Sequence, residues 1–290
     1  MNILIFGKSG QVATSLVHQA SAHGIVATSL GRDDFDLASL QDHRDILELI
    51  DAHQPKAIIN AAAYTAVDKA ESEPELADAL NHKAPQNLAL ACKERGLPFL
   101  HISTDFVFDG LADRPYRESD PTGPVSIYGS SKLAGEKAAI AAGGCVAIMR
   151  TAWVFSATGG NFVKTMLRLG AERETLTVVA DQFGGPTPAD AIADALYIMA
   201  KQLIDAPEKA GIFHFAGAPQ THWADFARAI MEEAGLAANV TNITTADYPT
   251  PAARPAWSVL DCTKIEKTFG IKQPNWRDTL RETIQTLRQH

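Results

Sequence analysis

The strongest constraint on the fold is a regular alternation that begins at the first residue. Short β-branched apolar runs alternate with longer segments in which apolar residues recur at helical spacing. This alternation is typical of a parallel sheet covered by helices, and apolar runs without a polar face indicate strands buried on both sides. The predicted strands are residues 2–6, 26–30, 57–60, 99–103 and 146–151, and the helices between them are 11–23, 40–53, 77–95 and 130–142.

After about residue 151 glycine and proline interrupt this pattern more often. Further strands are predicted at 176–179 and 212–215, and further helices at 162–173, 189–203 and 223–234. The fold class is therefore α/β, with a doubly wound parallel sheet and a smaller C-terminal α/β lobe. We expect a larger domain at residues 1–175, to which the chain returns around 189–215, and a lobe made mainly of residues 176–290.

Composition excludes several classes of protein. The formal net charge is -8 and no basic run occurs, so the clustered positive charge that nucleic acid requires is missing. The first apolar run has four residues, too few for a signal peptide or a membrane span, and we expect a cytoplasmic protein. Cys92, Cys145 and Cys262 lack CxxC spacing, and the histidines form no paired motif, so we expect no metal.

A glycine-rich turn follows the first strand and opens the first helix. Gly7 allows a tight turn, Gly10 lets a ligand approach the backbone, and Ala13 is small enough for close helix packing. Free amides at the start of a helix attract a pyrophosphate. In this context the turn indicates a dinucleotide site and a Rossmann fold, whereas two glycines alone would fit an ordinary turn. The expected cofactor contacts are Gly7, Ser9, Gly10, Gln11 and Val12.

The end of the second strand is where an adenosine ribose would lie in this fold. Arg32 could pair with a 2′-phosphate, while a nearby carboxylate could accept from a 2′-hydroxyl. Asp36 and Leu37 could bracket the adenine. Arg32 favours NADPH over NADH, although any one of these residues could equally be an ordinary loop residue. The third strand ends in Ala61 and Ala62, small residues that would let the backbone approach a flat cofactor.

Tyr128 and Lys132 are four residues apart, so a helix places them on one face. A nearby ammonium group lowers the pKa of a phenol, which would prepare Tyr128 for proton transfer. Thr104 follows the fourth strand, and parallel sheets bind ligands at the carboxyl ends of their strands. We therefore predict a catalytic group of Tyr128, Lys132 and Thr104 around one carbonyl oxygen. A lone Tyr-x-x-x-Lys would be weak evidence.

Several segments together are similar to the extended short-chain dehydrogenase/reductase family, and within it to the reductases of dTDP-linked 4-keto-deoxysugars. The resemblance covers nearly the whole chain. Its most specific blocks are Asn60 to Glu71 and Ser103 to Gly110; the others are Phe6 to Val12, Tyr128 with Lys132, Arg150 to Phe155, Asn161 to Met166 and Asp181 to Gly184.

The resemblance implies reduction of the 4-keto group of dTDP-4-dehydro-L-rhamnose by NADPH or NADH, in the biosynthesis of nucleotide sugars and cell-surface polysaccharide. It implies that Tyr128 is the proton donor, that Lys132 binds the cofactor ribose and that Thr104 is the third catalytic hydroxyl. By the same likeness Asp105 and Trp153 contact the sugar, and Ala63, Tyr64 and Thr65 border the nicotinamide.

Three positions depart from the family pattern. Phe106 stands where an aromatic hydroxyl is usual, Trp257 replaces an amide, and Ser15 stands where some relatives have an acid linked to magnesium, so no metal is carried over. The first two keep a second interpretation open, a reductase or epimerase of another nucleotide sugar. A third is a catalytically silent dinucleotide-binding regulatory subunit. The resemblance also leaves a homodimer open.

Overall fold

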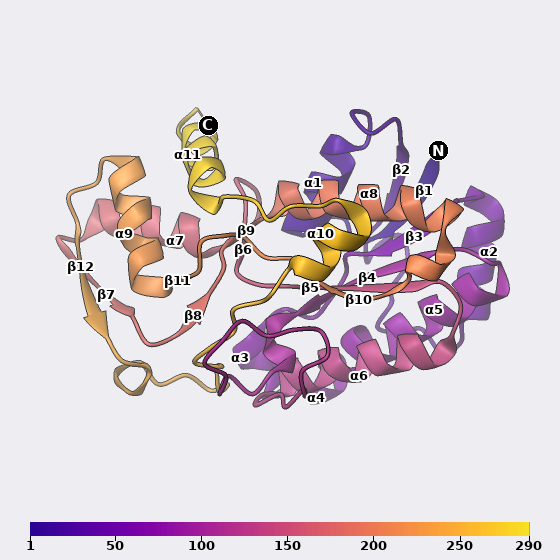
Figure 1. The fold of residues 1–290 in the computed structure, drawn as a ribbon, viewed down its shortest axis with the longest axis horizontal. Helices are drawn as coiled ribbons and strands as arrows, with labels where there is room; N and C mark the ends of the chain where they lie inside the picture. The colour runs from indigo at the N-terminus through magenta and orange to yellow at the C-terminus, as the bar shows by residue number, and fades with distance from the viewer. Residues whose placement is uncertain (290) are drawn as a thin grey trace.

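The computed structural model describes residues 1–289. Its centre is a six-stranded sheet in which every neighbouring pair is parallel (Figure 1). The chain order reverses at the first strand, which creates a crevice at the carboxyl ends of the first and third strands. The strands are β1 (Asn2–Phe6), β2 (Val26–Leu30), β3 (Ala57–Asn60), β4 (Phe99–Thr104), β5 (Val146–Thr151) and β10 (Gly211–His214), in the order β10-β5-β4-β3-β1-β2.

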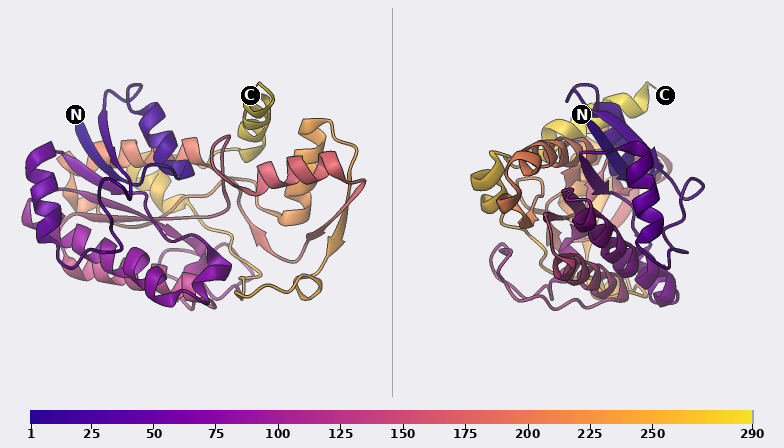
Figure 2. Two further views of the ribbon diagram at one scale, coloured as in Figure 1. Left: turned by 180° about the vertical axis from the view of Figure 1, so that it is seen from behind. Right: turned by 90° about the vertical axis from the view of Figure 1, so that its right-hand side faces the viewer.

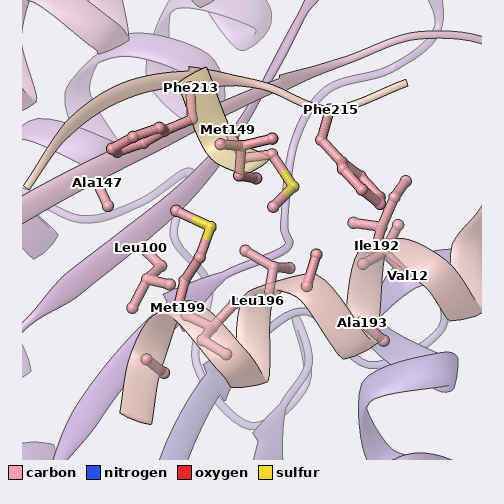
Figure 3. Close-up of a cluster of buried hydrophobic side chains, with 14 of the residues drawn as sticks. Val12, Leu100, Ala147, Met149, Ile192, Ala193, Leu196, Met199, Phe213 and Phe215 are labelled. Atoms are coloured by element: carbon pink, nitrogen blue, oxygen red, sulfur yellow. The ribbon is translucent and has the colours of Figure 1, made fainter. Parts of the chain in front are cut away.

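Helices cover both faces of this sheet (Figure 1). Side chains alternate along a strand, so Ile3 and Ile5 of β1 belong to one apolar core while Leu4 and Phe6 belong to the other. Figure 3 shows part of the first core, where Leu196 packs beside the strands. This face carries α1 (Gln11–Gln19), α8 (Ala189–Asp205) and α10 (Thr263–Phe269), and the opposite face carries α2 (Arg44–His53), α5 (Ala84–Glu94) and α6 (Ile127–Ala142).

A second lobe lies beside the sheet, at the left of Figure 1 and the right of the left-hand view in Figure 2. It has its own apolar core, in which Phe226 and Trp276 are fully buried. Three short strand pairs frame it: β7 (Thr175–Val179) with β12 (Asn239–Ile243), β8 (Phe183–Gly184) with β11 (Thr221–His222), and β6 (Val154–Phe155) with β9 (Thr187–Pro188). Its helices are α7 (Phe162–Glu172), α9 (Trp223–Ala234) and α11 (Trp276–Arg288).

The single helix predicted at 77–95 is wrong in detail. The chain forms α4 (Pro74–Asp78), a π-helical turn η1 (Ala79–Lys83) and then α5, and a further short helix, α3 (Val67–Ala70), precedes them. Pro85 lacks the N–H that would bond the carbonyl of Asn81, so the α-helical ladder is interrupted there. A π turn accommodates that interruption. Within residues 1–289, no helix is both long and apolar enough to span a bilayer.

Candidate active site

The glycine turn packs directly against the end of the third strand. Gly7 has φ +119°, and a Cβ there would lie 3.0 Å from the carbonyl carbon of Ala61, so a side chain would force β1 and β3 apart. Gly10 precedes α1 with open space around it and makes no side-chain cap. The first amides of α1 therefore face free space at the crevice, a suitable place for a pyrophosphate.

The other three residues predicted in this turn differ in what they can offer. Ser9 is exposed at its tip, whereas Val12 is buried in the core and could meet a cofactor only through its backbone. The side chain of Gln11 is already engaged, because its Nε2 donates to Val154 O at 3.2 Å and its Oε1 accepts from Ser156 and Asn161, both at 2.9 Å. Gln11 thus ties the glycine turn to the second lobe.

At the end of β2, the predicted adenosine contacts are split between surface and core. The Arg32 side chain is 74% exposed, with its guanidinium Nε 3.8 Å from the carboxylate of Asp36. Leu37 is buried in the core beneath the loop. The cation at position 32 can therefore reach a ligand phosphate, while the Leu37 side chain serves packing.

The loop after β3 is held by a residue that the sequence interpretation missed. Asn81, in η1, accepts from Tyr64 N at 2.8 Å and donates to Tyr64 O at 3.1 Å. It also donates to Ser131 of α6 at 3.1 Å, so one buried amide fixes the segment Ala61–Thr65 to the helix of Tyr128. The sequence did contain a signal for this role, because Asn81 is an amide that stands four residues before a proline inside a predicted helix.

The phenol of Tyr64 is engaged in a hydrogen bond away from the predicted catalytic residues. Its hydroxyl donates to Glu73 at 2.6 Å, and this hydrogen bond raises the pKa of Tyr64 to about 12. Ala61, Ala62, Ala63 and Tyr64 are partly buried, and Thr65 is exposed. The segment therefore presents mainly backbone and small side chains to the crevice.

Tyr128 and Lys132 lie in the first two turns of α6, next to the end of β4. Ser126 caps the helix by accepting from Gly129 N at 3.2 Å. A Cβ on Gly129 would lie 2.3 Å from Phe106 O, so the glycine permits close contact between α6 and the turn after β4. The rings of Tyr128 and Phe106 meet edge to face with centroids 5.5 Å apart. This packing brings Tyr128 beside Thr104 and Asp105.

Thr104 and Asp105 form a buried polar pair. The hydroxyl of Thr104 donates to Asp105 Oδ1 at 3.0 Å and accepts from Phe106 N at 3.2 Å. The other carboxylate oxygen of Asp105 is buried, with no hydrogen-bond partner among residues 1–289. Burial raises the pKa of Asp105 to about 6. The Ser258 hydroxyl lies near this carboxylate but donates to Phe183 O at 3.2 Å, so the buried oxygen could accept from a ligand hydroxyl.

The expected effect of Lys132 on Tyr128 is wrong for this state of the protein. Lys132 Nζ donates to Ile102 O at 2.6 Å and lies 3.2 Å from His101 Nε2, and none of the hydrogen bonds among residues 1–289 joins it to Tyr128. Burial, together with the charge of Asp105, raises the pKa of Tyr128 to about 12, although the Thr104 hydroxyl acts in the opposite direction. The phenol is therefore held protonated.

Trp153 stands where the central sheet passes into the second lobe. Its φ of +49° is rare for a large side chain, and such strain is typical of functional positions. The indole stacks on Trp223 with ring centroids 3.5 Å apart, and a Cβ on Gly184 would lie 2.6 Å from it. The ring is thus fixed by neighbours on both β8 and α9.

Trp153 and Trp223 form part of the wall of a cavity of about 480 Å³ in the second lobe. The cavity reaches the buried polar pair through Phe106, which packs on Tyr128, and Ser258, whose hydroxyl lies beside the carboxylate of Asp105. Its wall is mainly apolar, with further contributions from α7, β7 and the loop that contains Arg254. A volume of this size suits a small-molecule ligand.

Trp257, one of the departures from the family pattern, does not line this cavity. Its indole Nε1 donates to Arg114 O at 2.9 Å, and its ring packs beside Phe183. The side chain instead holds the loop before Tyr116 in place. Among residues 1–289, histidine, cysteine and carboxylate side chains do not gather in a group of three that could bind a metal.

Comparison with known proteins decides the family. Residues 1–289 match the model of the RmlD substrate binding domain. The chain belongs to this family. It is 45% identical to dTDP-4-dehydrorhamnose reductase of Sinorhizobium fredii, over 99% of this chain and 98% of that protein.

Solved structures of this family have the same fold. The dTDP-4-dehydrorhamnose reductase of Clostridium acetobutylicum superimposes with a TM-score of 0.91 at 36% identity, covering 99% of this chain and 100% of that one. The enzyme of Bacillus anthracis, solved in complex with NADP, gives 0.88 at 32% identity, covering 98% and 99%. The α/β class with a central parallel sheet, predicted from the sequence, is confirmed.

Proposed function

We propose that this protein is a dTDP-4-dehydrorhamnose reductase. It reduces the 4-keto group of dTDP-4-dehydro-L-rhamnose to a hydroxyl with NADPH or NADH, and so supplies dTDP-L-rhamnose for polysaccharide biosynthesis. The observation that carries this proposal is the cluster formed by Tyr128 of α6 with Thr104 and Asp105 at the end of β4, next to residues that line the cavity of the second lobe. Full-length similarity to named reductases supports the substrate.

The residues around the crevice fit a nicotinamide dinucleotide. The free amides at the start of α1 would hold its pyrophosphate, and Arg32 would meet a 2′-phosphate. The segment Ala61–Thr65 would border its nicotinamide end. When bound, the reduced cofactor supplies the hydride that C4 of the sugar accepts.

Tyr128 completes the reduction by donating its phenolic proton to the carbonyl oxygen. Its raised pKa keeps that proton in place at neutral pH, as a donor requires. Thr104 stabilises the same oxygen through its hydroxyl, once a sugar hydroxyl competes for Asp105 and frees the threonine proton. Lys132 would hold the cofactor ribose through its side-chain nitrogen.

The second lobe would bind the rest of the substrate. Asp105 Oδ2 accepts from a sugar hydroxyl, which satisfies its missing hydrogen bond, and Trp153 forms one wall of the sugar site. The larger domain predicted at residues 1–175, to which the chain returns around 189–215, would bind the dinucleotide, and residues 176–290 would bind mainly the nucleotide sugar. The exception is β6 and α7, which pack in the core of the second lobe and belong with the sugar site, where α7 lines the cavity. The protein acts in the cytoplasm, without nucleic acid or a membrane as partner, and a homodimer is a testable assembly.

The decisive experiment compares the wild-type protein with Tyr128→Phe. Oxidation of NADPH, and separately of NADH, is followed by absorbance with dTDP-4-dehydro-L-rhamnose as substrate. The variant should lose turnover while its affinity for NADPH, measured by cofactor fluorescence, stays within about twofold. Undiminished turnover in Tyr128→Phe would remove this residue as the proton donor.

One alternative substrate has a specific motivation. Phe106 lines the cavity without the hydroxyl that is usual in the family, so a polar contact to the sugar is missing. A reductase or epimerase acting on another nucleotide sugar would prefer a different member of a panel of keto-sugar nucleotides. A silent regulatory subunit would turn over none of them, but the sequence keeps Tyr128, Lys132 and Thr104, which argues against it.

A further inference from the structure

A chain of buried polar groups lies behind Lys132, and the mechanism above does not use it. Asn60 of β3, His101 of β4 and Lys132 of α6 are each no more than 2% exposed. Asn60 Nδ2 lies 3.0 Å from His101 Nδ1, and His101 Nε2 lies 3.2 Å from Lys132 Nζ. The imidazole therefore bridges an amide and an amine.

The hydrogen bonds around Asn60 fix which nitrogen of His101 carries the proton. Asn60 Oδ1 accepts from the backbone N–H of Ala62 at 3.1 Å, so the amide must turn its NH₂ group toward His101. An NH₂ group only donates, and Nδ1 must accept from it. Burial is the main cause that holds the pKa of His101 well below its ordinary value, so the ring is neutral. Its one proton then lies on Nε2.

That proton points at Lys132. An ammonium group has three donors and no acceptor, so Nε2–H and a charged Lys132 would oppose each other. A neutral amine has a lone pair that can accept from Nε2–H, and it can still donate to Ile102 O at 2.6 Å. The neutral form of Lys132 therefore satisfies every hydrogen bond that links Asn60, His101 and Lys132.

We propose that His101 is a positioning residue that sets the protonation state of Lys132, by donating Nε2–H to the neutral amine. His101 touches neither substrate nor cofactor and acts only through Lys132. This inference rests on the proposed function for its role in turnover, because it makes the charge beside Tyr128 depend on His101. The protonation of Lys132 itself is independent of any substrate.

The surrounding charges support the proposal. Burial lowers the pKa of Lys132 to about 8, while the carboxylate of Glu136, one turn further along α6, raises it. Glu136 is itself paired with Arg150 of β5 at 2.6 Å, which reduces its effect. His101 on β4 is neutral and Tyr128 on α6 is protonated, so neither adds a charge beside Lys132. The Nε2–H donor of His101 is then the local contact that opposes protonation of Lys132.

The test is a titration of Lys132 by carbon NMR of protein labelled in lysine, without cofactor, with the resonance assigned by its loss in Lys132→Met. In the wild type it should titrate at or below about pH 8. In His101→Gln the amide oxygen can turn toward the ammonium, so the titration should move up by about one unit. The control His82→Gln replaces a partly buried histidine that does not belong to this hydrogen-bonded group, and it should leave the Lys132 titration unchanged.

A second variant keeps the histidine and changes its tautomer. In Asn60→Asp both oxygens accept, one from Ala62 N and one from His101 Nδ1–H, so Nε2 becomes an acceptor for an ammonium. This variant should also raise the Lys132 titration. If the proposed function is right, the pH profile of kcat/KM should move by a similar amount in both variants.

The outcomes separate the two proposals. If wild-type Lys132 titrates near the ordinary lysine value of about 10.4, the inference about His101 fails. It also fails if His101→Gln and Asn60→Asp are folded and both leave the titration where it was. If the titrations move as expected but no keto-sugar nucleotide is reduced, the inference stands and the proposed function fails.

Discussion

The helix that carries Tyr128 is joined to the sheet by a buried ion pair. Glu136 and Arg150 have side chains that are only 1% and 3% exposed. Arg150 Nε donates to both carboxylate oxygens, at 2.9 and 3.2 Å, and Nη2 donates to one of them at 2.6 Å. Among residues 1–289 the guanidinium also meets His214 and the ring of Phe108, and neither of these is an anion.

Glu136→Gln keeps the size of this side chain and removes its charge. The guanidinium then stays buried without a counterion, and breaking a buried pair in this way costs about 3–5 kcal/mol. For a chain of this length the midpoint of thermal unfolding should fall by roughly 10 °C. Calorimetry, or circular dichroism on heating, measures that shift directly.

An exposed pair in the same chain provides the matched control. Arg168 and Glu172 also lie on a helix at 3.0 Å, but their side chains are 61% and 53% exposed. Glu172→Gln should cost less than about 0.5 kcal/mol, because water screens the pair. In the double variant Glu136→Leu with Arg150→Met, both charges are gone and stability should return to within about 2 kcal/mol of the wild type. Equal small losses in Glu136→Gln and Glu172→Gln would refute the reasoning.

Three further substitutions test the site. Asp105→Asn should stabilise the fold by up to roughly 3 kcal/mol above pH 6. The reason is that the folded-state pKa of Asp105, about 6, exceeds the ordinary value of 3.8, so the wild-type protein loses stability as the pH rises through the folded-state pKa. Denaturant unfolding at pH 4 and pH 8 measures the difference in stability. Gly184→Ala places a Cβ 2.6 Å from the stacked Trp153 indole and should raise KM for the sugar nucleotide, measured by steady-state kinetics. Gly135→Ala meets Asn81 O at 1.9 Å and should weaken NADPH binding, measured by fluorescence titration, despite better helix propensity.

Each of these has a result that would contradict it. A stability gain in Asp105→Asn that is the same at pH 4 and pH 8 would exclude the buried carboxylate as its cause. Gly160→Ala is the control for the two glycine variants, because a Cβ there meets open space. If Gly184→Ala or Gly135→Ala behaves like this control, the corresponding close contact does not constrain the site.

The central sheet could be predicted because its strands carry an unambiguous pattern. Runs such as 2–6 and 57–60 are apolar on both sides, and only burial between two helical layers explains that. Strands of two residues, such as β6 and β8, have no period to detect. Pro85 is a local signal for an interrupted helix near 79–83, but the close approach of Asn81 to Gly135 is a contact between distant segments that local propensity does not describe.

The site was only partly predictable, for a related reason. The spacing of Tyr128 and Lys132 is a local feature that can be read directly from the sequence. The partners of Lys132, in contrast, are set by tertiary packing. His101 lies 31 residues from Lys132 in the sequence, and nothing around either residue indicates that they meet. The expected lowering of the Tyr128 pKa failed for that reason, since the direction of the Lys132 side chain cannot be read from spacing.

Gln11 imposes a mechanical condition on the enzyme. Its single amide joins the turn that would hold the pyrophosphate to the β6–α7 connection of the neighbouring lobe, through Val154, Ser156 and Asn161. Any swing of one lobe against the other must either pivot at this point or break all three hydrogen bonds. The cleft between the lobes can therefore open most on the side away from Gln11 and least beside the glycine turn. A sugar nucleotide could then dissociate while the dinucleotide remains bound.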